Sequence, residues 1–241
     1  LLVAKDFQIF GKDRSTGPKE YDETTVDNGA LKIKTLNEQD IQAISKTSGV
    51  ETVREAYQLS PLYVTRDAGS KKFNLSLESY SPAQKPVVEY GQTPSTDLAA
   101  SQVILPDDYL SGLGFSSAED AVGKSIVVVF RKSAGSAPTA EQLQAALAAN
   151  SGNIQSTVSS LSKTAFETKE YRLSIIAVTK KAATEISIGT KPLLVGYEQA
   201  KQMNEFLTKD TPSFEKYAVA YVRVKNGSQR AERDKVQKAL S

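Results

Sequence analysis

The 241-residue chain contains no cysteine and no histidine. Zinc sites of the common kinds need these ligands, and Cys nucleophiles and Ser-His-Asp triads need the side chains themselves. The absence of cysteine also fits a bacterial surface domain that folds without disulfides. The catalytic groups that the composition still allows are carboxylates, serine paired with lysine, and tyrosine. The remaining alternative is a chain without catalytic function. We expect no catalytic, cofactor-binding or metal-binding residue and no cofactor.

The chain also lacks an excess of charge of one sign and is poor in aromatic residues. Its 30 basic and 28 acidic residues give a net charge of +2, aromatic residues make up 7%, and tryptophan is absent. A nucleic-acid-binding surface is usually basic, and single-strand binding needs aromatic stacking platforms. We therefore expect no nucleic-acid partner. A hydrophobic content of 39% and a charged content of 24% are typical of a folded, polar domain.

Long apolar runs and a basic leader segment are also missing, and the chain begins Leu1-Leu2-Val3. These features indicate a domain excised from a larger protein, as expected of a segment between two transmembrane helices. A fragment of a soluble multidomain protein would have the same features.

Local patterns predict an α+β fold. Thr35 and Glu38 have the spacing of a capping box, and a helix over 35–48 would present Leu36, Ile41 and Ile44 on one face. Residues 81–100 have the proline-rich composition of a linker. Further strands are expected at 1–10, 50–59, 62–65, 73–77, 103–105, 126–130, 171–178, 192–195 and 217–224, and further helices at 139–149, 197–207 and from 228 onward.

The stretch LPDDYLSGLGFSSAEDAVGKSIVVVF, residues 105–130, contains two partial phosphate-binding motifs. Gly112 and Gly114 match the first two glycines of a dinucleotide fingerprint, but Ser117 occupies the position of the third. Gly123-Lys124-Ser125 matches the end of a P-loop, but Ala118 occupies the position of its earlier glycine. The predicted order is also helix then strand, which points the wrong helix end at a phosphate. We interpret the glycines as terminators of short helices and Lys124 as a cation near a helix C-terminus.

Two further groups of residues have the types that catalysis requires. Asp107, Asp108, Glu119 and Asp120 are better explained as helix caps and first-turn acids than as acid–base or Ca²⁺ sites. Ser-x-x-Lys, the spacing of a serine–lysine hydrolase, occurs at Ser160/Lys163 and Ser213/Lys216 without the accompanying motifs. A hydrolase remains an alternative that requires one of these pairs in a cleft.

One ordered set of motifs resembles a known family. The residues Thr35-Leu36, Asp40-Ile41, Ile44, Gly49-Val50 and Val53 resemble the first helix and second strand of the large extracytoplasmic domain of MacB/FtsX-type ABC transporter permeases. Further along, the chain is similar to that family at Val103–Leu105, Tyr109–Phe115, Asp120, Gly123–Ile126 and Tyr171–Val178, where Ala177 replaces the usual glycine. The resemblance covers most of 31–240 in order.

The resemblance implies a domain of two parts. A membrane-proximal part (Porter-like) of two strand–helix–strand units comprises residues 1–85 and 214–241. An inserted, mainly β part (Sabre-like) comprises 95–212. The Ala/Ser-rich block at 133–165 departs from the family pattern, as does the polar loop at 11–30.

The resemblance also implies a function. The chain would be the extracytoplasmic domain of a permease in the bacterial cell membrane, transmitting ATP-driven helix motion to the outside for export or signalling. Its partners would be a cytoplasmic ATP-binding subunit, a second permease copy, and an extracellular lipoprotein, peptide or small molecule. It would not itself be an enzyme. The alternative is a free-standing surface adhesin or binding domain.

Overall fold

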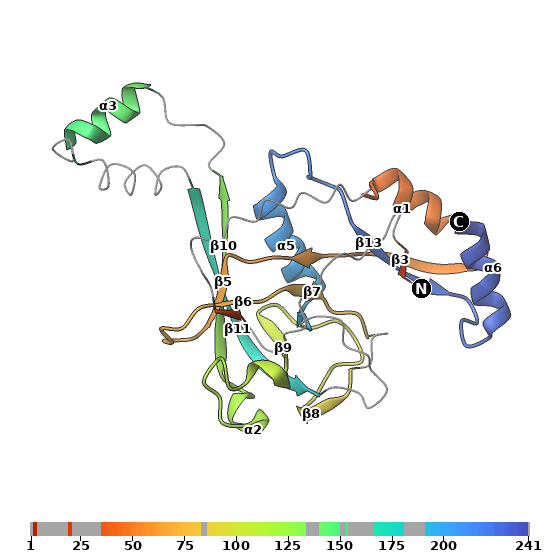
Figure 1. Cartoon of the computed structure of the whole chain (residues 1–241). Coiled ribbons are helices and arrows are strands. Elements are labelled where there is room, and N and C mark those ends of the chain that lie inside the picture. The colour runs from red at the N-terminus through yellow and green to blue at the C-terminus, as the bar shows by residue number, and fades with distance from the viewer. Residues whose placement is uncertain are drawn as a thin grey trace.

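The fold is α+β, as the sequence predicts, and contains two sheets (Figure 1). The structure is a computed structural model that describes residues 2–3, 19–20, 35–82, 86–133, 140–149, 153, 166–180 and 191–240. A small three-stranded sheet lies at one end, and a ten-stranded sheet forms the rest of the body. No helix in these ranges is long and apolar enough to cross a membrane.

The small sheet joins the beginning and the end of the described chain. Its order is β1 (Leu2–Val3), β13 (Val219–Val224) and β3 (Val50–Ala56), and all neighbours are antiparallel. Helices α1 (Glu38–Ser45) and α6 (Arg230–Leu240) cover one face. Apolar residues alternate along a strand with period two, so one face of β13 can be buried. The core of this small unit consists of Leu36, Ile41, Ile44, Val50, Ala220, Val222, Val224 and Val236.

Helix α1 starts two residues later than the Thr35/Glu38 capping box predicts. Asn37 is the N-cap: its Oδ1 accepts from the Asp40 N–H at 3.0 Å, while Asp40 Oδ2 accepts from the Asn37 N–H at 2.9 Å. The expected cap is wrong because Leu36 is still extended and pairs with Tyr217 through two backbone hydrogen bonds. A long-range strand contact therefore displaces a local capping signal.

The large sheet is built around the long hairpin of β10 (Ser125–Ser133) and β11 (Phe166–Thr179). The apolar run 126–130 predicted a buried strand, and Ile126, Val128 and Phe130 are fully buried. Helix α5 (Tyr197–Thr208) packs on this sheet through Ala200 and Met203. The remaining strands are β2 (Lys19–Glu20), β4 (Gln58–Leu59), β5 (Tyr63–Arg66), β6 (Phe73–Asn74), β7 (Leu77–Ser79), β8 (Val88–Gly91), β9 (Gln102–Pro106) and β12 (Leu193–Val195).

The Ala/Ser-rich block lies between the two strands of this hairpin. Helix α3 (Ala140–Ala149) falls within it, where a helix was predicted, and lies beyond the hairpin end, far from the small unit (Figure 1). The second helical segment considered, 154–164, is outside the described residues.

Several strands pair across the boundary predicted between the two parts. Within 1–85, β5 pairs with β10 and β7 pairs with β12, both in the large sheet. The sequence predicts a linker at 81–100, but this segment contains β8, which pairs with β11. The linker prediction is wrong because β8 and its partner strand lie far apart in sequence. The division into 1–85 with 214–241 and 95–212 as domains remains a prediction.

We call the small sheet with α1 and α6 the small unit, and the large sheet with the other helices the large unit. Two glycines of the large unit provide a matched test of packing. Gly91 and Gly123 both have positive φ, +84° and +86°. A Cβ on Gly91 would lie 2.2 Å from the Ile176 carbonyl oxygen, whereas a Cβ on Gly123 would meet nothing within 4 Å. We expect Gly123→Ala to cost about 1–2 kcal/mol of unfolding free energy from backbone strain alone. Gly91→Ala should cost about 1–3 kcal/mol more, from overpacking.

The measurement is urea denaturation of both variants beside the parent chain. Equal costs for the two substitutions would contradict the close approach of β8 to β11.

Candidate functional site: the junction of the two sheets and its groove

The glycine-containing stretch at 105–130 forms two short helices. The 3-10 helix Asp107–Tyr109 is followed by turns that end at Gly114, and α2 (Ala118–Ala121) is followed by Gly123. Gly114 and Gly123 have φ of +78° and +86°, which explains their use as terminators. Gly112 does not have a positive φ and lies within the turns. Nothing here resembles a helix N-terminus aimed at a phosphate from a glycine loop.

The acidic residues of this stretch serve the short helices. Asp107 accepts from the Asp108 N–H, and Ser117 caps α2 by accepting from the Asp120 N–H. Asp120 pairs with Lys124, and this hydrogen bond, with one from the Ser116 N–H, lowers the pKa of Asp120 to about 2. Lys124 is therefore held by a specific carboxylate. No group of three or more metal-ligating side chains occurs among the described residues.

The serine–lysine pairs gain no support from the structure. Ser213 and Lys216 lie in an exposed turn after α5, where the Lys216 N–H donates to the Ser213 carbonyl at 3.2 Å. Ser160 and Lys163 are outside the described residues. The described pair thus lacks the cleft that a hydrolase needs.

A single buried tyrosine connects the small sheet to the large sheet along the chain. Tyr57 is the only residue between β3 of the small sheet and β4 of the large sheet. Its N–H donates to Ser79 Oγ at 3.0 Å, and its carbonyl accepts from the Ser79 N–H at 2.9 Å. Its ring lies 5.3 Å from the Tyr197 ring and 6.0 Å from the Tyr217 ring, centroid to centroid. Backbone hydrogen bonds and ring contacts therefore hold the connection between β3 and β4 in place.

Arg54, near the end of β3, extends this contact. Its guanidinium pairs with Asp97 and stacks on the Tyr197 ring, with Cζ 3.7 Å from the centroid. Asp97 Oδ1 also accepts from the Leu98 N–H at 2.9 Å and the Tyr197 N–H at 3.3 Å, so it is oriented by the start of α5. Cation–π contacts add most where the cation is partly desolvated, and the Arg54 and Asp97 side chains are 33% and 29% exposed.

Two tyrosine hydroxyls complete the junction. Tyr197 donates to Glu55 Oε2 at 2.7 Å, and Tyr221 of β13 donates to Glu78 of β7. Burial is the main cause that raises the pKa of Tyr197, Tyr217 and Tyr221, and it raises the pKa of Tyr57 to about 12. These groups are therefore neutral donors at ordinary pH. Strand β3 is therefore hydrogen-bonded to α5 through Glu55, and β13 is hydrogen-bonded to β7 through Tyr221.

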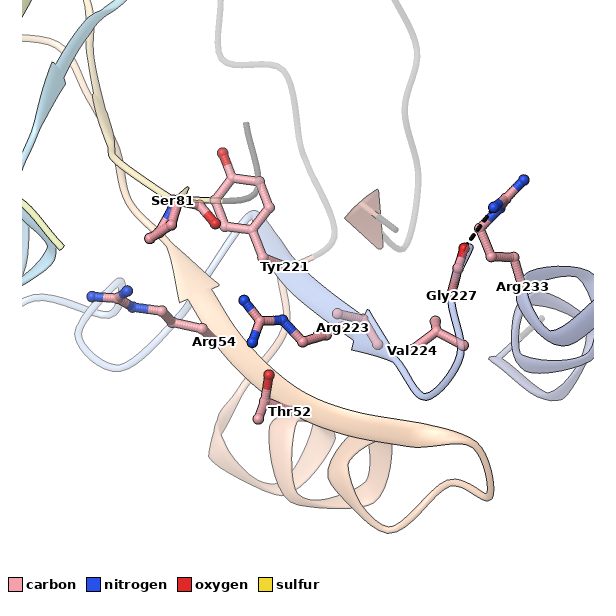
Figure 2. A pocket seen from close by; sticks show the side chains of 10 residues that line it. Thr52, Arg54, Ser81, Tyr221, Arg223, Val224, Gly227 and Arg233 are labelled. Carbon is pink, nitrogen blue, oxygen red and sulfur yellow. Dashed lines mark hydrogen bonds between the residues drawn. The ribbon is translucent and has the colours of Figure 1, made fainter. Parts of the chain in front are cut away.

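A groove of about 400 Å³ lies beside the junction (Figure 2). One wall is the face of the small sheet opposite α1 and α6, where Tyr221 lies opposite Arg54 and Arg223 opposite Thr52. Ser81 and Pro82, just after β7, form the other wall, and Arg233 of α6 lies at the end near Gly227.

None of the junction or groove residues was predicted from the sequence. Arg54, Arg223 and Tyr197 lie in ordinary strand or helix contexts, and no local motif marks them. The available signal was one arginine in each of β3 and β13, on the face away from the buried valines, and it is informative only once these strands are known to be neighbours.

Comparison with known proteins found no matching family model and no matching curated protein. Solved structures do match. The periplasmic region of MacB from Actinobacillus actinomycetemcomitans aligns at 11% identity over 87% of this chain and 74% of that one, with a TM-score of 0.46. The extracellular domain of the noncanonic ABC-type transporter YknZ from Gram-positive bacteria aligns at 12% identity over 86% and 82%, with a TM-score of 0.45.

A domain of a putative permease protein from Porphyromonas gingivalis aligns at 13% identity over 83% of this chain and 69% of that one, with a TM-score of 0.42. All three are extracytoplasmic or permease domains of the kind named by the sequence resemblance. Likeness at these scores and identities assigns no activity and no residue role.

A double-mutant cycle tests the Arg54–Asp97 pair. We expect Arg54→Met and Asp97→Asn to be coupled by about 0.5–1 kcal/mol in unfolding free energy, because the pair is half-buried and oriented. The matched control is Arg230–Asp234, a helix pair whose side chains are 87% and 61% exposed. Its coupling should be about 0.3 kcal/mol or less. Equal coupling free energies in both cycles would show that the junction pair stabilises the fold no more than an exposed helix pair does.

The tyrosines predict how stability depends on alkaline pH. The unfolded chain ionises Tyr57 near pH 10, while the folded chain ionises it near pH 12. The folded state then holds the extra proton, so the free energy of unfolding falls between pH 10 and about 12. We expect Tyr57→Phe to make this fall shallower by about 1 kcal/mol per pH unit.

Urea unfolding across this pH range measures the slope. Tyr90→Phe, which removes an exposed hydroxyl on β8, is the control and should leave the slope unchanged. An unchanged slope in Tyr57→Phe would contradict the buried junction.

Proposed function

We propose that this chain is the extracytoplasmic domain of an ABC transporter permease of the MacB/FtsX type. In this role it transmits ATP-driven movement of transmembrane helices to a substrate or partner outside the membrane. The observation that carries the proposal is the braced junction between the two sheets. The ordered sequence resemblance over residues 31–240 supports the family.

The arrangement of the small unit suits this role. β1 and α6 both belong to it, so the first and last described elements lie on one body (Figure 1). The large sheet, with its β10–β11 hairpin and α3, extends away from that body. In the proposal the transmembrane helices move the small unit, and the large unit contacts the substrate or partner.

Transmission by rigid-body movement requires that the junction resist bending. Tyr57 leaves no flexible linker between β3 and β4, and three side-chain contacts bridge the units: Arg54–Asp97, Tyr197–Glu55 and Tyr221–Glu78. Rigid rotation of units about an interface is one of the established forms of conformational transmission. A cytoplasmic ATP-binding subunit would supply the energy, and a second permease copy or an extracellular lipoprotein, peptide or small molecule would be the further partner.

Pulsed electron paramagnetic resonance on the full-length gene product in membranes tests the proposal. The chain has no cysteine, so engineered cysteines take spin labels selectively once any others in the gene product are removed. Gln42→Cys on α1 and Glu170→Cys on the hairpin are both exposed and report the distance between the units. We expect that distance to stay constant on ATP addition, while the distance from Gln42 to a label on the membrane-spanning part changes.

Two controls sharpen the result. Adding Arg54→Met should broaden the Gln42–Glu170 distance distribution, and Arg230→Met should not. Labelling of Gln42→Cys in intact cells by a membrane-impermeant maleimide should succeed. Protection of this site would sink the extracytoplasmic location, and an ATP-dependent change between the two units would sink rigid transmission.

A further inference from the structure

The groove beside the junction is rich in positive charge. Three of its lining residues are arginines, Arg54, Arg223 and Arg233, and none of the described residues that line it is an aspartate or glutamate. The alternation of β13 explains the placement: Val222 and Val224 are buried toward the helices, so Arg223 lies on the opposite face. Its cross-strand neighbour there is Thr52, and Arg54 lies two residues further along β3.

The three arginines differ in the groups that their guanidinium groups already contact. Arg54 is paired with Asp97 and stacked on Tyr197. Arg233 donates to the Gly227 carbonyl at 2.6 Å and the Ser228 carbonyl at 3.3 Å, which holds its guanidinium without neutralising it. Among the residues that the structure describes, no carboxylate pairs with Arg223, whose side chain extends across the sheet face (Figure 2). Within the described part of the chain, no carboxylate therefore offsets the charges of Arg223 and Arg233 in this groove.

We propose that this groove binds a phosphate ester group, with Arg223 as its main contact. A guanidinium presents a planar fork of donors that fits phosphate oxygens in a bidentate way. The Thr52 hydroxyl beside Arg223 supplies a further donor, and Arg233 contributes attraction from the groove end. Such interactions are stronger than neutral hydrogen bonds because the acceptor is charged.

The size of the groove favours an ester over a bare ion. A volume of about 400 Å³ lies within the range of small-molecule sites, larger than one phosphate needs. Pro82 gives the groove an apolar wall that an attached organic group can cover. A phosphate also offers more acceptor oxygens than a carboxylate, and donors come from both β3 and β13.

Two sources have this chemistry: a phospholipid headgroup and a soluble phosphate ester. The lipid source rests on the proposed function, in which the small unit is the part nearer the membrane. The binding test uses the 241-residue chain alone and needs no ATPase. A failure to bind would therefore leave the proposed function standing, and a failure of the proposed function would leave the phosphate site to be judged by itself.

The experiment compares soluble and membrane probes. Glycerol 3-phosphate and inorganic phosphate are titrated against ¹⁵N-labelled chain while amide and arginine Nε–H shifts are followed by NMR. Acetate serves as the carboxylate comparison. Co-sedimentation is measured with vesicles of phosphatidylglycerol in phosphatidylcholine and with phosphatidylcholine alone. The variants are Arg223→Gln, Arg223→Lys and, as the matched control, Lys225→Gln, which removes an exposed charge just after β13 outside the groove.

We expect Arg223→Gln to weaken phosphate binding by about tenfold or more, as a lost charge-assisted hydrogen bond does. Arg223→Lys should retain part of the affinity, and Lys225→Gln should stay within about twofold of the parent. Binding of the soluble esters alone would assign a soluble ligand, and binding of anionic vesicles alone would assign a lipid headgroup; either supports the site.

Three results would overturn the proposal: no saturable binding of any phosphate probe, acetate binding as tightly as phosphate, or equal losses in Arg223→Gln and Lys225→Gln. Circular dichroism of each variant checks the fold. If Arg223→Gln proves unfolded, Thr52→Val and Arg223→Lys carry the same comparison.

Discussion

The structure depends on the crossing of one strand from the small sheet to the large one at Tyr57. Because β3 and β4 are separated by this residue alone, the two sheets cannot move apart on this side without breaking the paired hydrogen bonds to Ser79. The tyrosine rings, the Arg54 stack and the hydroxyl–carboxylate bonds then build outward from this point. These contacts join the core of the small sheet to that of the large sheet.

The junction and the groove share residues, and this links shape to ligand chemistry. Arg54 lines the groove while holding Asp97, and Tyr221 lines it while holding Glu78. A bound anion would therefore act on a surface whose neighbours already set the angle between the sheets.

Local patterns in the sequence predicted the element types well where a run was long and apolar. Residues 126–130, 171–178 and 217–224 lie in or around strands, and 197–207 lies in α5. Pairing was not predictable from the same patterns. Leu36 with Tyr217, β5 with β10 and β8 with β11 are long-range contacts whose partners leave no local mark. For the same reason the capping residue moved to Asn37, and the arginines of the groove became neighbours only through the register of β3 with β13.

The pairing of β3 with β13 also sets an order for folding during synthesis. Val53 and Val222 lie opposite each other although most of the chain separates them. Closing so long a loop is entropically costly and slow, and domains fold as the chain emerges from its N-terminus. All ten described strands of the large sheet precede β13 in the chain, so they are made before it. Until β13 is made, β3 lacks its partner strand although the strands of the large sheet are already present. β13 and α6 then complete the small unit.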